Sequence, residues 1–303
     1  MRRSLVASLI LVARVAAADT SATQDITGGT ATTVGEFPNV VAILVGGGIC
    51  TGTLVAPTWV LSAGHCVNPE VTHLADHAAV VASIQVIVGT VNAGLPGGTK
   101  VKAKETYDPG FSPQVYGVHD ISLIELASPV TSVTPAVVNL DPTNSPIGTA
   151  VTMVGYGATT GGGNPGKEFT VGDRASAKCS DVVPASTGVT LDDGKVMCYS
   201  QADGKGVCGG DSGGPAFAII DGVPQVVAVT SFGDTNCAAF GVDFRTDTDA
   251  DFLLSHVDLC PATDPNCGSS GGGCCAVASR ETGTTALLGL GVVAFALRRR
   301  RRS

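Results

Sequence analysis

Short apolar stretches separated by turn-forming residues recur along most of the chain. The segments 54–55 and 59–61 flank Pro57, a pattern that predicts two short strands joined by a turn. The segment 119–126 has the apolar patterning of a largely buried strand. Helical stretches rich in Lys, Glu and Leu are few, and one terminal helix is expected at about 247–257. The pattern therefore predicts an all-β fold.

The composition supports this fold class. The 303 residues are 44% hydrophobic but only 5% aromatic, 40 of them are glycine, and Val, Ile and Thr abound. β-Branched residues favour strands, whereas glycine-rich segments such as 161–166 favour surface loops. A chain of this length can form one large or two medium domains with a substantial core.

The first 18 residues have the pattern of a secretory signal peptide. Arg2 and Arg3 precede an apolar run at 5–12, and three alanines at 16–18 supply small residues for cleavage. The alternative, a buried N-terminal helix, fits the length and the flanking residues less well. Residues 1–18 are therefore predicted to direct export.

The C-terminal part is unusual. A glycine- and cysteine-rich linker, 258–283, leads to an apolar segment at 284–297 and then to Arg298 and four further arginines. Fourteen apolar residues are short for a membrane span, which needs about 20. Cys274-Cys275, the apolar segment and the arginines resemble a bacterial surface-sorting tail of the MYXO-CTERM type. That resemblance implies a membrane protease that removes residues 284–303, and the alternative is an ordinary tail anchor.

The charge argues against nucleic-acid binding. The whole chain carries −8, and because residues 1–25 carry +1 and residues 276–303 carry +5, the part between them carries −14. No basic face remains to neutralise a phosphate backbone. A membrane contact is expected only through the C-terminal tail.

The cysteines indicate an oxidising compartment, outside the cytoplasm. No four of the ten cysteines have C-x-x-C spacing, so no structural zinc site is expected. Six lie in the globular part, at positions 50, 66, 179, 198, 208 and 237, and four lie in the C-terminal part, at positions 260, 267, 274 and 275.

The stretch GVCGGDSGGP, 206–215, is the strongest candidate for chemistry. It is either a polar turn or a loop that holds Ser212 at a sharp bend, with bare backbone N–H groups facing a developing negative charge. The second interpretation requires a histidine and a carboxylate. His65 follows a predicted strand and precedes Cys66, and Asp120 opens a largely buried strand, where a carboxylate needs a partner. Asp120 would orient His65, and His65 would take the proton of Ser212.

The motifs LSAGHC, DISLIEL and GGDSGGP occur in the order His, Asp, Ser, and with ITGGT (26–30), MVGYG (153–157) and SFG (231–233) they resemble the trypsin/chymotrypsin-like serine proteases. The resemblance implies two antiparallel six-stranded β-barrels, at about 26–135 and 136–246, and a C-terminal helix. The protease domain would then span 26–257.

The resemblance also assigns roles to individual residues. The N–H groups of Gly210 and Ser212 would form an oxyanion hole. Asp211 would pair with the α-amino group of Ile26 after the chain is cut, and residues 19–25 would be a short propeptide. Because Gln24-Asp25 stands where related precursors often have Arg or Lys, a different protease is expected to make that cut.

Three disulfides and a specificity pocket follow from the same resemblance. The pairs would be Cys50–Cys66, Cys179–Cys198 and Cys208–Cys237, although spacing alone allows fifteen pairings of six cysteines. Gly206 would form the base of the pocket. An open, neutral pocket favours apolar or aromatic side chains, whereas Asp243 would favour basic ones if it points inward and would be solvated if it points outward. The remaining pocket residues would be Ser231, Phe232, Gly233 and Gly241.

The predicted function is an exported serine endopeptidase, extracellular or at the cell surface, that acts on proteins or peptides without a cofactor or metal. Two other functions stay open. One is a protease-shaped binding module that has lost catalysis. The other is an esterase with the same three residues, although the G-x-S-x-G motif and the Ser, Asp, His order of that class are absent.

Overall fold

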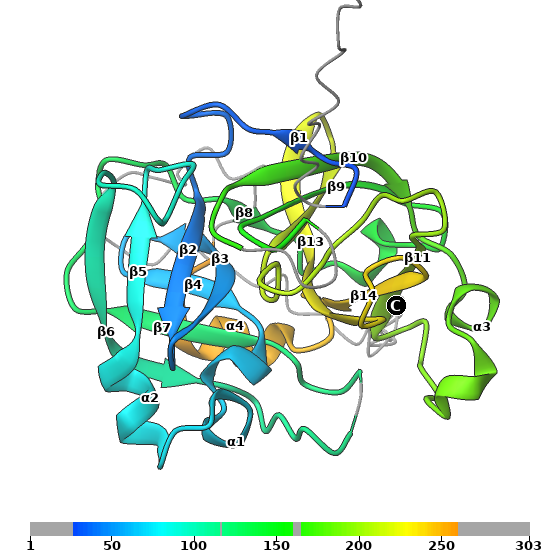
Figure 1. Ribbon diagram of the computed structural model, residues 1–303, viewed down its shortest axis with the longest axis horizontal. Helices are drawn as coiled ribbons and strands as arrows, with labels where there is room; N and C mark the ends of the chain where they lie inside the picture. Colours follow the sequence, from blue (N-terminus) through cyan, green and yellow to red (C-terminus); the bar gives the residue numbers. More distant parts are fainter. Residues whose placement is uncertain (1–26, 116, 160–164, 260–303) are drawn as a thin grey trace, which may run out of the picture.

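Two bodies of antiparallel strands lie side by side in the computed structural model, which describes residues 27–115, 117–159 and 165–259 (Figure 1). The predicted all-β class is confirmed. The first body is a closed barrel with the strand order β2-β3-β4-β7-β6-β5. Its strands are β2 (Val40–Val45), β3 (Gly48–Ala56), β4 (Trp59–Ser62), β5 (Gln85–Val88), β6 (Thr99–Tyr107) and β7 (Ser122–Leu126).

Alternating side chains explain why the first barrel closes. Successive residues of a strand point to opposite faces, so apolar side chains at every second position can face the barrel interior. Burying each of these aliphatic side chains contributes about 1.5–3 kcal/mol. The fully buried residues of this core include Val41, Ile43, Leu54, Val60 and Ile124.

The second body is an eight-stranded sheet, whereas the sequence predicted a second six-stranded barrel. Its hydrogen-bonded path runs β1-β10-β9-β12-β13-β14-β11, and β8 pairs with β13 in parallel. The difference arises because two short strands join the six long ones: β1, drawn in blue in Figure 1, crosses from the start of the domain to pair with β10. The strands are β1 (Thr30–Ala31), β8 (Val137–Val138), β9 (Ala150–Gly155), β10 (Phe169–Ala175), β11 (Val196–Ser200), β12 (Pro215–Ile220), β13 (Val223–Gly233) and β14 (Phe240–Arg245).

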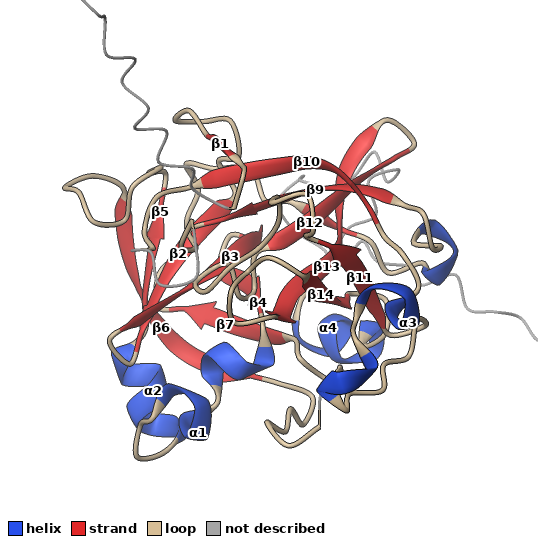
Figure 2. Ribbon diagram, turned by 45° about the vertical axis from the view of Figure 1, so that its right-hand side comes forward, coloured by secondary structure: helices blue, strands red, loops and turns tan. Residues whose placement is uncertain are grey.

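The helices are short and lie at the periphery of the two bodies (Figure 2). The terminal helix α4 begins later than predicted, after Asp249, and packs on the first barrel through His256, whose ring lies 4.5 Å from that of Tyr107.

Within the described residues, every helix is too short to cross a membrane. The predicted signal peptide, linker and apolar tail lie outside the described residues, apart from the start of the linker at 258–259. The α-helices are α1 (Pro69–Thr72), α2 (His77–Ser83), α3 (Cys179–Val182) and α4 (Ala250–His256).

A buried carboxyl group joins the N-terminal segment to the rest of the fold. Glu168, beside β10, accepts hydrogen bonds from the hydroxyl of Thr32 (2.6 Å) and from that of Tyr156 (2.7 Å). The Tyr156 hydroxyl also lies against the carbonyl of Thr90 in the first barrel. Burial raises the pKa of Glu168 to about 7, although both hydrogen bonds act in the opposite direction.

We expect Glu168→Gln to flatten the pH dependence of stability. The folded chain holds the Glu168 proton from its ordinary pKa of 4.5 up to about 7, whereas the unfolded chain releases it. Stability therefore falls as the pH rises through that interval, by up to about 3 kcal/mol. Because Gln does not ionise, the variant loses less stability between pH 4.5 and 8. Thermal unfolding across this range measures the difference.

The matched control is Glu70→Gln, which neutralises an exposed carboxylate on α1. This variant should lose stability in parallel with the unsubstituted protein. The same parallel loss for Glu168→Gln would show that Glu168 is ionised throughout the range.

Candidate active site

Neighbouring strands of the first barrel bring His65 and Asp120 together. His65 lies on the 3₁₀ turn η1 (Gly64–Val67), which follows β4, and Asp120 lies just before β7. β4 and β7 are antiparallel neighbours, with Ser62 opposite Ser122, so the end of one strand meets the start of the other. Two residues 55 positions apart in the sequence therefore reach the same edge of the barrel.

His65 and Asp120 form a partly buried pair, in which Asp120 is the buried member. The ring atom Nδ1 of His65 lies 3.1 and 3.0 Å from the two carboxylate oxygens of Asp120, and the backbone N–H of His65 donates to Oδ1 at 2.9 Å. The hydroxyl of Ser231 donates to Oδ2. Burial alone would raise the pKa of Asp120, but the charge of His65 and these hydrogen bonds outweigh it and lower the pKa. A charged Asp120 fixes a proton on Nδ1 and leaves Nε2 as the free acceptor.

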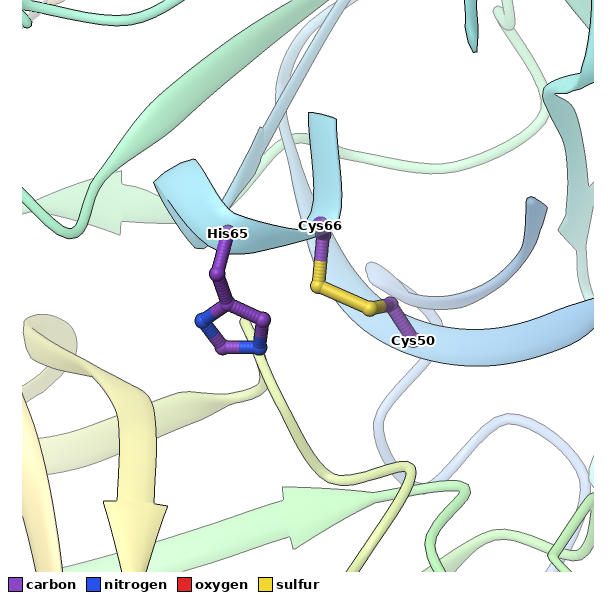
Figure 3. Close-up of side chains that lie close together, drawn as sticks. All are labelled: Cys50, His65 and Cys66. Atoms are coloured by element: carbon purple, nitrogen blue, oxygen red, sulfur yellow. A yellow bond between two sulfur atoms is a disulfide. The ribbon is translucent and has the colours of Figure 1, made fainter. Parts of the chain in front are cut away.

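The backbone of the first barrel places Ser212 beside this pair. The N–H of Thr51 donates to the carbonyl of Ser212 at 2.8 Å. Cys50, which precedes Thr51, is bonded to Cys66, and Figure 3 shows this disulfide beside the ring of His65. The hydroxyl of Ser212 makes no hydrogen bond to any described residue, His65 included. The carbonyl of Ser212 also lies 3.7 Å from the sulfur of Cys66, the residue that follows His65. Hydrogen bonds between a nucleophile and its base are often long in unliganded proteins and tighten when substrate binds.

Two backbone amides beside Ser212 are free to bind an anion. In the described part of the chain, the N–H groups of Gly210 and Ser212 donate to no acceptor, whereas that of Gly213 donates to the Thr230 carbonyl at 2.7 Å. Gly210 has a φ of +102° and Gly213 one of +80°, which favour glycine. A side chain on Gly213 would also overlap Thr51. The loop therefore needs glycine at both positions to expose its amides.

Asp211 is a buried carboxylate without a cation among the described residues. It accepts hydrogen bonds from the N–H groups of Gly157 (2.7 Å) and Cys208 (2.8 Å). Burial outweighs both bonds and raises the pKa of Asp211 to about 7. Ile26, the expected partner, lies outside the described residues. The next residue, Thr27, reaches this region, because its carbonyl accepts the N–H of Gly206 at 3.0 Å.

The structure holds the six cysteines of the globular part in three disulfides. The pairs Cys50–Cys66, Cys179–Cys198 and Cys208–Cys237 are those that the family resemblance implied. The sulfurs of Cys50 and Cys66 lie within 4.8 Å of a nitrogen of His65. Because both sulfurs are used by the disulfide, this cluster offers a metal only the imidazole.

A cavity of about 270 Å³ opens beside Ser212. Gly206, Gly241 and Asp243, which the sequence placed in this pocket, do not line it. Asp243 is fully buried, so the solvated alternative for this residue is wrong. Burial raises its pKa to about 8, and the nearby hydroxyl of Thr230, which makes no hydrogen bond of good geometry to either oxygen, offsets this only in part. The lining residues are Val207, Cys208, Gly209, Ser212, Thr230, Ser231, Phe232, Gly233, Asp234, Thr235 and Cys237.

Sequence reasoning missed two buried polar side chains at this site. The hydroxyl of Thr51 donates to the carbonyl of Gly210 and accepts the N–H of Tyr156, both at 2.9 Å. Gln201 is next to the cavity wall, because its amide binds both backbone groups of Val207, a residue that lines the cavity. Neither residue belongs to a motif, and their contacts arise only when distant segments meet.

Comparisons with known proteins agree with this geometry. The family model described as Trypsin matches residues 26–251. Human serine protease 56 is 30% identical over 256 residues, which cover 80% of this chain but only 40% of that protein. Serine protease SP24D of Anopheles gambiae is 30% identical over 72% of this chain and 75% of its own length. Brachyurin of Leptuca pugilator is also 30% identical, over 69% of this chain and 86% of its own length.

We expect Thr51→Val to destabilise the protein by about 1–3 kcal/mol, because it leaves the buried carbonyl of Gly210 and the N–H of Tyr156 without their partner. Chemical denaturation measures the change. Thr53→Val is the matched control, since Thr53 is fully buried on the same strand and its hydroxyl has no hydrogen-bond partner among the described residues. Equal effects of the two substitutions would contradict the bridging role of Thr51.

Proposed function

The chain belongs to the trypsin family of serine endopeptidases, and we propose that it cleaves peptide bonds through His65, Asp120 and Ser212. The observation that carries the proposal is the contact between His65 and the buried Asp120, together with the amides of Gly210 and Ser212, which are unpaired among the described residues. No single one of these features is specific. Together they supply a base, its orienting charge, a nucleophile and an anion site, along two cavities that share Ser231 and Phe232.

Each group has a defined part in the proposed reaction. The hydroxyl of Ser212 attacks the substrate carbonyl while Nε2 of His65 takes its proton, and the charge of Asp120 stabilises the resulting imidazolium. The N–H groups of Gly210 and Ser212 bind the oxyanion, and losing one such donor typically costs about 10²–10³ in rate. His65 then protonates the leaving amine, and water hydrolyses the acyl-enzyme by the same route.

The other two functions considered from the sequence find less support. A protease-shaped binding module would need no charged partner for its histidine, yet Asp120 accepts hydrogen bonds from the ring N–H of His65, from its backbone N–H and from the hydroxyl of Ser231. The esterase alternative receives no support from the family match.

We also propose that the protein is made as an inactive precursor. Asp211 sits between the two amides of the anion site and is buried without a cation among the described residues. A cut before Ile26 would create an α-amino group that could pair with Asp211 and hold the loop in place, because an unpaired buried charge is costly. Thr27 already contacts Gly206 at the base of this region. The precursor segment would be residues 19–25, and an activating protease with a preference other than Arg or Lys would remove it.

Three disulfides support an extracellular location. The proposed route to the cell surface uses a signal peptide at 1–18 for export and a sorting tail at 284–303 for attachment, until a membrane protease processes the tail. The substrates are proteins or peptides, and the pocket beside Ser212 favours apolar side chains over basic ones before the cleaved bond.

We expect Ser212→Ala in the activated chain to lower kcat/KM on peptide substrates by about 10⁴-fold or more. It should also abolish labelling by a fluorophosphonate probe, which bonds to an activated serine. Ser231→Ala should act more mildly, by about 10–100-fold, because it removes one hydrogen bond to a charged group. Ser180→Ala, at an exposed serine of α3, is the control and should leave the rate unchanged. Cleavage by Ser212→Ala at the unsubstituted rate would remove the enzymatic proposal.

Activation is tested with full-length Asp25→Lys, which immobilised trypsin can cut before Ile26. We expect cutting to raise kcat/KM by about 10²–10³, the effect of gaining an ordered oxyanion donor. N-terminal sequencing verifies the new Ile26 terminus. Asp211→Asn in the same background should be cut equally but gain little activity, since its neutral amide cannot pair with the α-amino group. An uncut chain as active as the cut one would contradict the precursor proposal.

A further inference from the structure

Gln201 occupies the space beside Gly206 and Gly241, the two glycines that the family resemblance places in the specificity pocket. A methyl group on Gly206 would overlap the amide of Gln201. A methyl group on Gly241 would lie 2.5 Å from Oε1 of Gln201 and 3.0 Å from Cγ2 of Val207. Real side-chain atoms do not approach so closely. The amide of Gln201 therefore fills the space that the two glycines vacate.

Gln201 is fixed in this position by its own hydrogen bonds. Its Oε1 accepts the N–H of Val207 at 3.0 Å, and its Nε2 donates to the carbonyl of Val207 at 3.1 Å. Its backbone N–H donates to the carbonyl of Ala239 at 2.9 Å. Only 1% of the residue is exposed. Moving the amide aside would leave two buried backbone groups of Val207 unpaired, which is unfavourable.

A buried carboxyl group without a hydrogen bond among the described residues lies on the same side of the sheet. Asp243 follows Gly241 by two positions on β14, so both residues face the same side of that strand. Thr230, which lines the cavity, is the register partner of Asp243 on β13. Asp243 is fully buried, and neither of its oxygens has a hydrogen-bond partner in the described part of the chain. A buried carboxyl group in this state would gain strongly from a cationic side chain that reached it.

We propose that Gln201 determines specificity by closing the pocket above Asp243, so that the protein cleaves after aliphatic side chains of medium length. Aromatic side chains are too long for the shortened pocket, and basic side chains do not reach the carboxyl group. The inference rests on the proposed peptidase function and deepens it. It also explains why Gly206 and Gly241 do not line the cavity.

The test compares activated full-length chains, each carrying Asp25→Lys, on three peptides with Leu, Phe or Arg before the cleaved bond. We expect the unsubstituted pocket to prefer Leu by about tenfold or more. Gln201→Ala should raise kcat/KM for Phe and for Arg relative to Leu by about tenfold or more, because it reopens the base. Gln201→Ala with Asp243→Asn should keep the gain for Phe and lose the gain for Arg. Gln201→Met fills the same volume and should retain the original preference.

A binding measurement keeps the inference testable without turnover. In the Ser212→Ala background, 4-aminobenzamidine, a flat cation whose fluorescence rises in an apolar site, should bind the Gln201→Ala chain at least about tenfold more tightly than the chain with Gln201. If Gln201→Ala does not fold, Gln201→Asn, which shortens the side chain by one methylene and keeps the amide, takes its place in both measurements.

The outcomes separate the two proposals. Unchanged Leu, Phe and Arg ratios in the Gln201 variants, with normal fluorophosphonate labelling, would overturn the role of Gln201 and leave the peptidase intact. A gain for Arg that survives Asp243→Asn would overturn the role of Asp243, and with it the proposal that Gln201 closes the pocket above this residue. If the activated chain with Gln201 shows neither labelling nor cleavage, the peptidase proposal itself would be overturned, and the role of Gln201 depends on that proposal.

Discussion

A buried carboxyl group is stable only if hydrogen bonds or a cation replace the water that it loses. Asp120, Asp211 and Asp243 are all buried, and they differ in how far such partners stabilise them. Asp120 has the ring and backbone of His65 and the hydroxyl of Ser231, and its pKa is lowered. Asp211 has two backbone amides, and its pKa is raised to about 7. Asp243 has no hydrogen bond among the described residues, and its pKa is raised to about 8. Folding alone thus completes the Asp120–His65 pair and leaves two carboxyl groups that a cation could still stabilise.

The backbone around the nucleophile loop makes these arrangements possible. Methyl groups on Gly155 or Gly157 would overlap the carboxylate of Asp211, and one on Gly213 would overlap Ser62 and Thr51. Glycine is therefore required on both sides of the contact, in the loop and in the segments that receive it. The entropy that these glycines lose on folding is offset by hydrogen bonds such as the bridge from Thr51 to Gly210.

Local sequence motifs were enough to predict most of the candidate site and part of the fold. The motifs around His65, Asp120 and Ser212 could be recognised because each needs particular neighbours: a strand end, a buried strand and a glycine loop. The position of Gln201 could not be predicted, because its amide meets Gly241 only after the segment beyond β11 folds onto β14. The orientation of Asp243 depends on the register of its strand, because a slip of one residue would turn its side chain to the opposite face of the sheet. The extra strand β1 depends on pairing across more than a hundred residues, which leaves no local signal.

The proposed activation and the proposed specificity would share one short segment of chain. Thr27 contacts Gly206, Gly206 lies against Gln201, and Gln201 is held by Val207. The next residue, Cys208, donates its N–H to Asp211. A new N-terminus that neutralised Asp211 would therefore act on the same backbone that fixes the amide of Gln201. Because covalent bonds and hydrogen bonds along the six residues from Gly206 to Asp211 connect these groups, the base of the pocket and the anion site should become ordered together rather than in separate steps.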